Sequence, residues 1–236
     1  MKTILAFETS SPILSVALGT PKGKAQEIRA PGKLQHSENL IPLMDRLLKR
    51  EKLSLRQIDG FALTQGPGSF TGLRIGFSFL KGLLTAEKRP CYGALSLDMI
   101  AANFRLPAGS RLGVLVDARR ERIYARFYER HGEDWRAERG MELLSLSELE
   151  KKISDGTHLA GDALLRYRKP LEATWGKQIH FLDDRLSYPR AITLVQWFQS
   201  RDSRLFPFKR PRDFLPLYSR APEAEEKRRE QIVHAA

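Results

Sequence analysis

Residues 60–86, GFALTQGPGSFTGLRIGFSFLKGLLTA, form the most distinctive stretch of the chain and decide its fold class. Residues 60–64 have the apolar character of a buried strand, and residues 66–69 form a Gly-Pro-Gly-Ser turn. Residues 70–86 have the length and apolar content of a helix. A strand that passes through a glycine-rich turn into a helix is a building unit of α/β proteins. The stretch therefore predicts an α/β fold.

The segments on both sides extend this pattern into two similar halves. In the first half we expect three strands within residues 4–30, a helix at 37–50, a strand at 91–94 and a helix at 96–103. The second half repeats the order, with strands near 112–116, 122–128, 135–144, 157–160 and 178–182 and helices at 145–154, 164–174, 191–199 and 223–233. We predict two α/β lobes, residues 1–106 and 107–236, with a terminal tail that can return to the first lobe.

The composition excludes several classes of protein. The chain has 236 residues, 42% hydrophobic and 29% charged, as expected for a globular protein. Its single cysteine, Cys91, excludes a disulfide framework and a cysteine-based zinc site. We recognise neither a signal peptide nor an apolar stretch long enough for a bilayer, so we expect a cytoplasmic protein without a membrane segment.

The net charge of +12 leaves two interpretations open. The 40 basic residues are interleaved with 28 acidic ones along the whole chain. A solvated surface of mixed charge is the favoured interpretation, because no basic tail or block stands out. A surface that faces RNA is the second, because excess positive charge attracts polyanions without sequence specificity.

The turn at residues 66–72, GPGSFTG, matches no common nucleotide or hydrolase motif. It lacks the Gly-Lys-Ser/Thr of a phosphate-binding loop, and Thr71 stands where the dinucleotide fingerprint needs its third glycine. Ser69 is not in a nucleophile elbow, because Pro67 and Thr71 flank it in place of glycines. Two alternatives remain: a weak anion site made by Gly66, Gly68 and Ser69, or a tight turn in which Ser69 caps a closely packed helix.

The two hairpin turns and the histidines give no sign of a catalytic site. The hairpin turns at residues 8–11, ETSS, and 117–120, DARR, are where a two-lobed fold would hold nucleotide phosphates, and neither contains glycine. The five histidines lack metal-site spacing, and no Ser–His–Asp arrangement is recognisable. We therefore predict no catalytic residue, no metal ligand and no cofactor in this chain.

Five stretches together resemble the bacterial TsaB (YeaZ) family. They are residues 4–10 (ILAFETS), 35–42 (QHSENLIP), 66–76 (GPGSFTGLRIG), 116–124 (VDARRERIY) and 216–220 (PLYSR). The resemblance covers essentially the whole chain and is strongest in the first half. It implies the duplicated actin/Hsp70/sugar-kinase-like, RNase H-like fold, which agrees with the repeated order of elements.

The resemblance also implies a function. Family members are non-catalytic subunits in the formation of N6-threonylcarbamoyladenosine on tRNA, at the adenosine beside the anticodon. The related subunit TsaD holds the metal and transfers the threonylcarbamoyl group, and the ATPase TsaE joins the complex. Metal and ATP are thus expected in the partner subunits, tRNA is expected through the complex, and a homodimer of the free chain stays open.

Three positions distinguish this sequence from its relatives. TsaD has a pair of metal-binding histidines after a Pro-x-x-Gly strand end, and here Ser96 and Ile100 follow residues 90–93, PCYG. Since isoleucine cannot bind a metal, the resemblance implies that the catalytic metal site is absent. Glu8 stands where aspartate is usual in the family, at a position without a catalytic duty.

The helix at residues 70–86 is apolar nearly all round, so one sheet cannot cover it. With the helix at 37–50, it is the predicted surface for the catalytic partner, as the resemblance to TsaB suggests. That surface comprises Leu40, Met44, Leu47, Leu73, Arg74, Gly76, Phe77, Leu80, Lys81 and Leu84, with Phe77 and Leu80 at its centre. The alternative is that the two helices bury each other within the lobe.

The second hairpin supplies candidate contacts for tRNA, namely Arg119, Arg120, Arg122 and Arg126. Two rival functions remain beside the accessory subunit. One is an enzyme of the same superfold, a nucleotide-dependent kinase or carbamoyltransferase, which would bind nucleotide by itself. The other is an independent RNA-binding module, which would bind tRNA tightly without partners.

Overall fold

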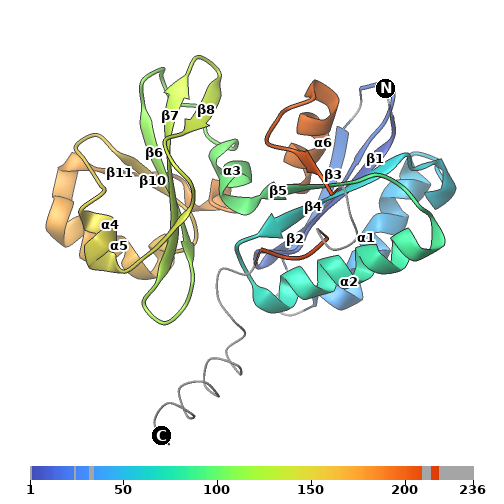
Figure 1. Ribbon diagram of the computed structural model, residues 1–236, viewed down its shortest axis with the longest axis horizontal. Helices are drawn as coiled ribbons and strands as arrows, with labels where there is room; N and C mark the ends of the chain where they lie inside the picture. The colour runs from blue at the N-terminus through green and yellow to red at the C-terminus, as the bar shows by residue number, and fades with distance from the viewer. Residues whose placement is uncertain (1, 24, 32–34, 209–213, 218–236) are drawn as a thin grey trace, which may run out of the picture.

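The computed structural model describes residues 2–23, 25–31, 35–208 and 214–217, which fold into two α/β lobes (Figure 1). Each lobe is built around its own sheet, and we call them the N lobe and the C lobe. Helices cover both faces of each sheet. No helix in the described ranges is long and apolar enough to cross a membrane.

The N-lobe sheet has the order β12-β5-β4-β1-β2-β3. Strands β1 (Ile4–Glu8), β2 (Ile13–Gly19) and β3 (Ala25–Pro31) form an antiparallel meander. Strand β4 (Gly60–Gly66) runs parallel to β1, and β5 (Cys91–Leu95) runs parallel to β4. The short strand β12 (Phe206–Pro207) pairs with β5 at the edge.

The C-lobe sheet repeats this arrangement. Strands β6 (Arg111–Asp117), β7 (Ile123–His131) and β8 (Asp134–Ala137) form the antiparallel meander, and β9 (Glu142–Leu144) also pairs with β7. Strands β10 (His158–Ala160) and β11 (His180–Phe181) add in parallel beside β6. The order β11-β10-β6-β7-β8 matches β5-β4-β1-β2-β3 of the N lobe, which confirms the predicted duplicated α/β fold.

Alternation along the strands decides which helices cover the N-lobe sheet. Leu5 and Phe7 pack on the face covered by α1 (His36–Arg50) and α2 (Phe70–Ala86). Ile4 and Ala6 point to the other face, which α6 (Ala191–Ser200) covers. In Figure 1, α6 accordingly lies on the opposite side of the sheet from α1 and α2.

The C-lobe sheet is covered in the same way. Helices α4 (Leu146–Glu150) and α5 (Leu164–Trp175) pack on one face, and α3 (Ser96–Ala101) packs on the other. Single turns of 3₁₀ helix lie at Leu55–Gln57, Gly176–Gln178 and Asp184–Leu186.

The lobes exchange helices, so the predicted ranges 1–106 and 107–236 do not each hold all the helices of one lobe. The α3 helix belongs to the first half of the sequence but buries Leu97 and Ile100 against the C-lobe sheet. The α6 helix belongs to the second half but buries Leu194 and Val195 against the N-lobe sheet. Hydrophobic spacing predicted both helices correctly, but it does not identify the sheet that each helix covers.

The end of the described chain also lies on the N lobe. Phe214 is buried beside Phe77 of α2, with ring centroids 4.8 Å apart. The backbone N–H of Leu217 donates to the carbonyl of Gln65, at 2.8 Å. The predicted helix at residues 223–233 falls outside the described residues.

Candidate functional site

The turn between β1 and β2 is closed by the carboxylate of Glu8. Its Oε1 accepts hydrogen bonds from the backbone N–H of Ser10 at 2.7 Å, the hydroxyl of Ser10 at 2.8 Å and the N–H of Ser11 at 3.0 Å. Burial raises the pKa of Glu8 from 4.5 to about 7, although interactions with Thr64, Ser10 and Ser11 oppose this shift. The N–H groups that could hold a phosphate at this turn therefore already have an acceptor within the chain.

The glycines of residues 66–76 bring helix α2 against this turn. A Cβ on Gly68 would overlap the carbonyl oxygen of Ser10, one on Gly72 that of Thr9, and one on Gly76 the hydroxyl of Thr9. The absence of side chains at these three positions thus permits a close approach of backbone to backbone.

The contacts of Ser69 bear on the two alternatives for the turn at residues 66–72. The Ser69 hydroxyl accepts from the N–H of Gly72 at 3.2 Å, so Ser69 caps helix α2. The Ser69 N–H itself donates to the Ser10 carbonyl at 2.6 Å. These contacts favour the cap over the weak anion site at Gly66, Gly68 and Ser69, because Gly68 is packed on Ser10 and the Ser69 amide already donates within the chain.

Gly72→Ala and Gly82→Ala are expected to have opposite effects on stability. The added methyl at residue 72 meets the Thr9 backbone, so we expect a loss of about 3 kcal/mol in the free energy of unfolding. At residue 82 the described part of the chain has no atom within 4 Å of the added methyl, and alanine favours the helix by about 0.8 kcal/mol. Urea denaturation of both variants checks this. Equal stabilities would contradict the packing of Gly72 on the turn.

The turn between β6 and β7 is likewise closed from within. Asp117 accepts the N–H of Arg119 at 2.8 Å, and the Ala118 N–H donates to the carbonyl of Arg122 at 3.0 Å. The Asp117 N–H donates to the carboxylate of Asp162 at 2.9 Å, and burial raises the pKa of Asp162 to about 6. This turn also lacks an open cradle of N–H groups for a phosphate.

The four arginines predicted to contact tRNA fall into two groups. Arg119 and Arg120 are exposed at the tip of the turn. Arg126 instead forms an ion pair with Asp98 of α3, at 2.8 and 3.0 Å, and only 18% of its side chain is exposed. Arg122 donates to the carbonyl of Leu143 at 2.7 Å. The prediction is therefore wrong for Arg126, which is used to hold α3 on the C lobe, and Arg122 is largely engaged by the fold.

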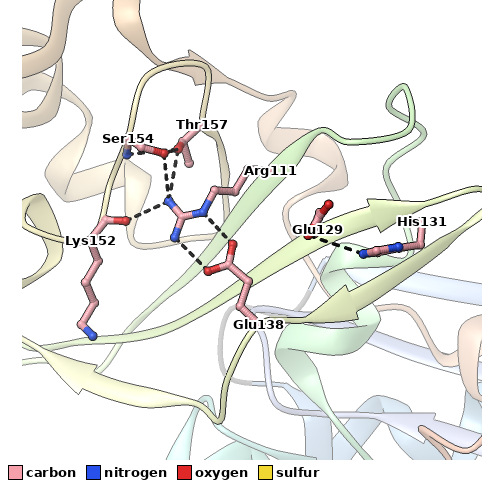
Figure 2. A network of polar contacts seen from close by, with 7 residues as sticks. All are labelled: Arg111, Glu129, His131, Glu138, Lys152, Ser154 and Thr157. Carbon is pink, nitrogen blue, oxygen red and sulfur yellow. Dashed lines mark hydrogen bonds and ion pairs between the residues drawn. The ribbon is translucent and has the colours of Figure 1, made fainter.

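Other bases of the C lobe are neutralised by neighbouring acids. Figure 2 shows Arg111 with two guanidinium nitrogens on Glu138, at 2.6 and 3.0 Å, and a third directed to the Lys152 carbonyl at 2.8 Å. The Lys152 ammonium pairs with Glu142 at 2.7 Å. Such pairing favours the mixed-charge interpretation for this part of the surface.

The expected outward position of Phe77 and Leu80 is wrong. Only 3% of Phe77 and 0% of Leu80 is exposed, and both belong to the core between α1, α2 and the sheet. The other buried members of the predicted partner surface are Leu40, Met44, Leu47, Leu73 and Gly76, and Leu84 is half-buried. These residues therefore do not form an open partner surface, because α1 and α2 bury their apolar sides within the lobe.

The outer side of α2 is formed by different residues. Arg74 and Lys81 of the predicted surface are exposed, together with Ser78 and Gly82, which lie one helical turn apart. Half-buried Ile75, Phe79 and Leu83 border them. The spacing of Ser78 and Gly82, four positions apart, is the sequence signal that points to this side of the helix.

Ser96 and Ile100 occupy structural positions in α3. The Ser96 hydroxyl donates to the carbonyl of Pro67 at 2.5 Å, and Ile100 is buried in the C-lobe core. The described ranges contain no group of three or more His, Cys, Asp or Glu side chains that could hold a metal ion.

The family whose sequence profile matches residues 32–197 is described as TsaD, tRNA N6-adenosine threonylcarbamoyltransferase. Over 206 residues the chain is 25% identical to the tRNA threonylcarbamoyladenosine biosynthesis protein TsaB of Buchnera aphidicola, a match that covers 85% of this chain and 95% of the relative. A solved structure described as YeaZ from Pseudomonas aeruginosa superposes with a TM-score of 0.72 and 25% identity, covering 92% of this chain and 100% of that one. The chain belongs to the TsaB (YeaZ) family.

A second TsaB relative, from Haemophilus influenzae, is 33% identical over 123 residues. That match spans 52% of this chain and 52% of the relative, so the chain matches about half the length of that protein. The similarity to the YeaZ structure extends through both lobes, because it covers 92% of this chain.

Proposed function

We propose that this TsaB-family chain is a non-catalytic subunit in the formation of N6-threonylcarbamoyladenosine on tRNA. It binds and activates a TsaD-like catalytic subunit, and the complex recruits a TsaE-like ATPase. The names of its TsaB relatives and the match to the TsaD profile support the pathway. Metal and ATP belong to the partner subunits in this proposal.

The absence of independent catalysis is supported by both hairpin turns. The N–H groups of Ser10 and Ser11 bond Glu8, and the N–H of Arg119 bonds Asp117. A nucleotide phosphate would have to displace Glu8 and Asp117 from these N–H groups before it could bind them. Ser96 and Ile100 add no metal ligand at the positions of the TsaD histidines. Nothing in these contacts favours the rival kinase or carbamoyltransferase.

We expect the partner subunit to bind the exposed outer side of α2. Ser78 and Gly82 are exposed, and no atom of the described residues lies within 4 Å of the position of a Cβ on Gly82. Two helices can approach closely where such small residues meet, and the half-buried Ile75, Phe79 and Leu83 would add apolar area at the edges. The buried side of the same helix fixes it rigidly on the sheet.

Ser78→Trp is expected to weaken binding to the TsaD-like subunit at least about 10-fold, because the indole prevents close approach at the interface. The melting temperature should stay unchanged, since Ser78 is exposed. Calorimetric titration and reconstituted tRNA modification, with each subunit omitted in turn, provide the measurements.

Gln196→Trp is the matched control, because it places the same indole on the exposed side of α6, on the opposite face of the sheet. It should leave affinity and modification unchanged. Full affinity of the Ser78→Trp variant would reject this interface. Modification that proceeds without the chain, or nucleotide turnover by the chain alone, would reject the accessory function.

A further inference from the structure

The turn between β6 and β7 contains three consecutive residues with left-handed backbone conformations. The φ angles are 62° at Arg119, 45° at Arg120 and 60° at Glu121. Residues with a Cβ are disfavoured in this region, and glycine is the residue that adopts it without strain. Strain of this kind concentrates at functional sites, where the side chains that cause it are needed.

Hydrogen bonds hold the turn in this conformation. The Asp117 carboxylate accepts the N–H of Arg119. The carbonyl of Arg122 accepts the N–H of Ala118, and the N–H of Arg122 donates to the carbonyl of Arg119, both at 3.0 Å. The Asp162 carboxylate fixes Asp117 from the other side. The tip is therefore preorganised, and it projects its side chains outward: 86% of the Arg119 side chain and 84% of that of Glu121 are exposed.

The charge on the tip is arranged asymmetrically. Only 15% of the Asp117 side chain is exposed, so its charge lies inside the turn, whereas Arg119 and Arg120 lie outside. The Arg119 guanidinium meets Asp117 through Nη1 at 3.2 Å, an exposed ion pair of small energy. Arg166 of α5 reaches Glu121 at 3.6 Å, which brings a further guanidinium beside the tip and offsets the Glu121 carboxylate.

We propose that Arg119 and Arg120 bind the phosphate backbone of RNA, and this inference rests on the proposed function in tRNA modification. A guanidinium donates in a planar fork that fits phosphate oxygens. Residues 117–122, DARRER, include no large apolar side chain that could anchor a protein partner. A rigid tip with two outward arginines is thus suited to a sugar–phosphate chain.

The test compares glycine variants that relieve the same backbone strain. The double variant Arg119→Gly/Arg120→Gly and the control Glu121→Gly should both melt at or above the temperature of the unmodified chain. In the reconstituted complex at about 0.1 M salt, the double variant should raise the KM and the Kd for tRNA about 10-fold and reduce the salt slope of binding by about two. The control should keep both constants within about two-fold.

Two results would overturn this inference. Unchanged tRNA affinity and salt slope of the double variant would show that the arginines do not bind phosphate. A loss of subunit assembly with normal tRNA affinity would assign the tip to a protein partner. Both differ from failure of the proposed function, in which modification would not require this chain at all.

Discussion

Replacing Leu80 with arginine should unfold the N lobe. Leu80 is fully buried between α2, α1 and the sheet, and truncation of such a leucine to alanine already costs about 2–5 kcal/mol. Arginine adds the desolvation of a charge among described core residues that are all hydrophobic, so we expect a loss on the order of 5 kcal/mol or more. Since small domains have about 5–15 kcal/mol of stability, little folded protein should remain.

The matched control is Ser78→Arg, which places the same charge on the exposed side of the same helix. Its melting temperature should equal that of the unmodified chain, and only its affinity for the TsaD-like subunit should fall. Thermal melting followed by circular dichroism separates the two variants. A Leu80→Arg protein that melts normally but fails to bind the partner would instead restore Leu80 to the interface.

Replacing Glu8 with glutamine should stabilise the chain at high pH. Burial raises the pKa of Glu8 from 4.5 to about 7. Between pH 4.5 and pH 7 the carboxyl is therefore protonated in the folded state but ionised in the unfolded state. The stabilisation from Glu8 is therefore complete below about pH 4.5 and disappears as the pH rises through 7. The shift corresponds to about 3 kcal/mol.

Glutamine keeps an oxygen that can accept from Ser10 and Ser11 but carries no titratable proton. At pH 8 the variant should be more stable than the unmodified chain by up to about 3 kcal/mol, and the difference should vanish near pH 4.5. The difference between the two proteins isolates Glu8, because Asp162, whose pKa is raised to about 6, titrates in both. A pH-independent difference in urea denaturation would contradict the protonation of Glu8 in the folded state.

Much of the local structure followed from residue patterns. The alternation in residues 14–18 and the helical spacing in residues 37–50 predicted β2 and α1 to within one or two residues. The Gly-Pro-Gly-Ser turn predicted the start of α2, and the cap at Ser69 was one of the two alternatives that it left open. These features are local, because strand alternation, helical period and capping each depend on residues a few positions apart.

The candidate site was predicted less well, because two helix faces can look equally apolar in sequence. Phe77 and Leu80 were placed outward, yet the sheet and α1 cover them, and Phe214 arrives from the far end of the chain to pack on Phe77. Arg126 appeared to belong to a basic hairpin, but Asp98 of α3 meets it across 28 residues of sequence. Contacts of this kind depend on which elements the fold brings together. The helical and strand periods of the sequence do not predict them, because each period describes only one segment.

The sequence by itself determined the α/β class, the repeated order of elements, the family resemblance and the lack of metal-ligand spacing. Only the tertiary structure decided that α3 and α6 exchange lobes, that Glu8 and Asp117 occupy the N–H groups of their own turns, and that the outer face of α2 presents Ser78 and Gly82. The physical reason is that propensity and periodicity act within one segment, whereas burial, pKa and exposed surface are set by segments that are distant in the chain and adjacent in space.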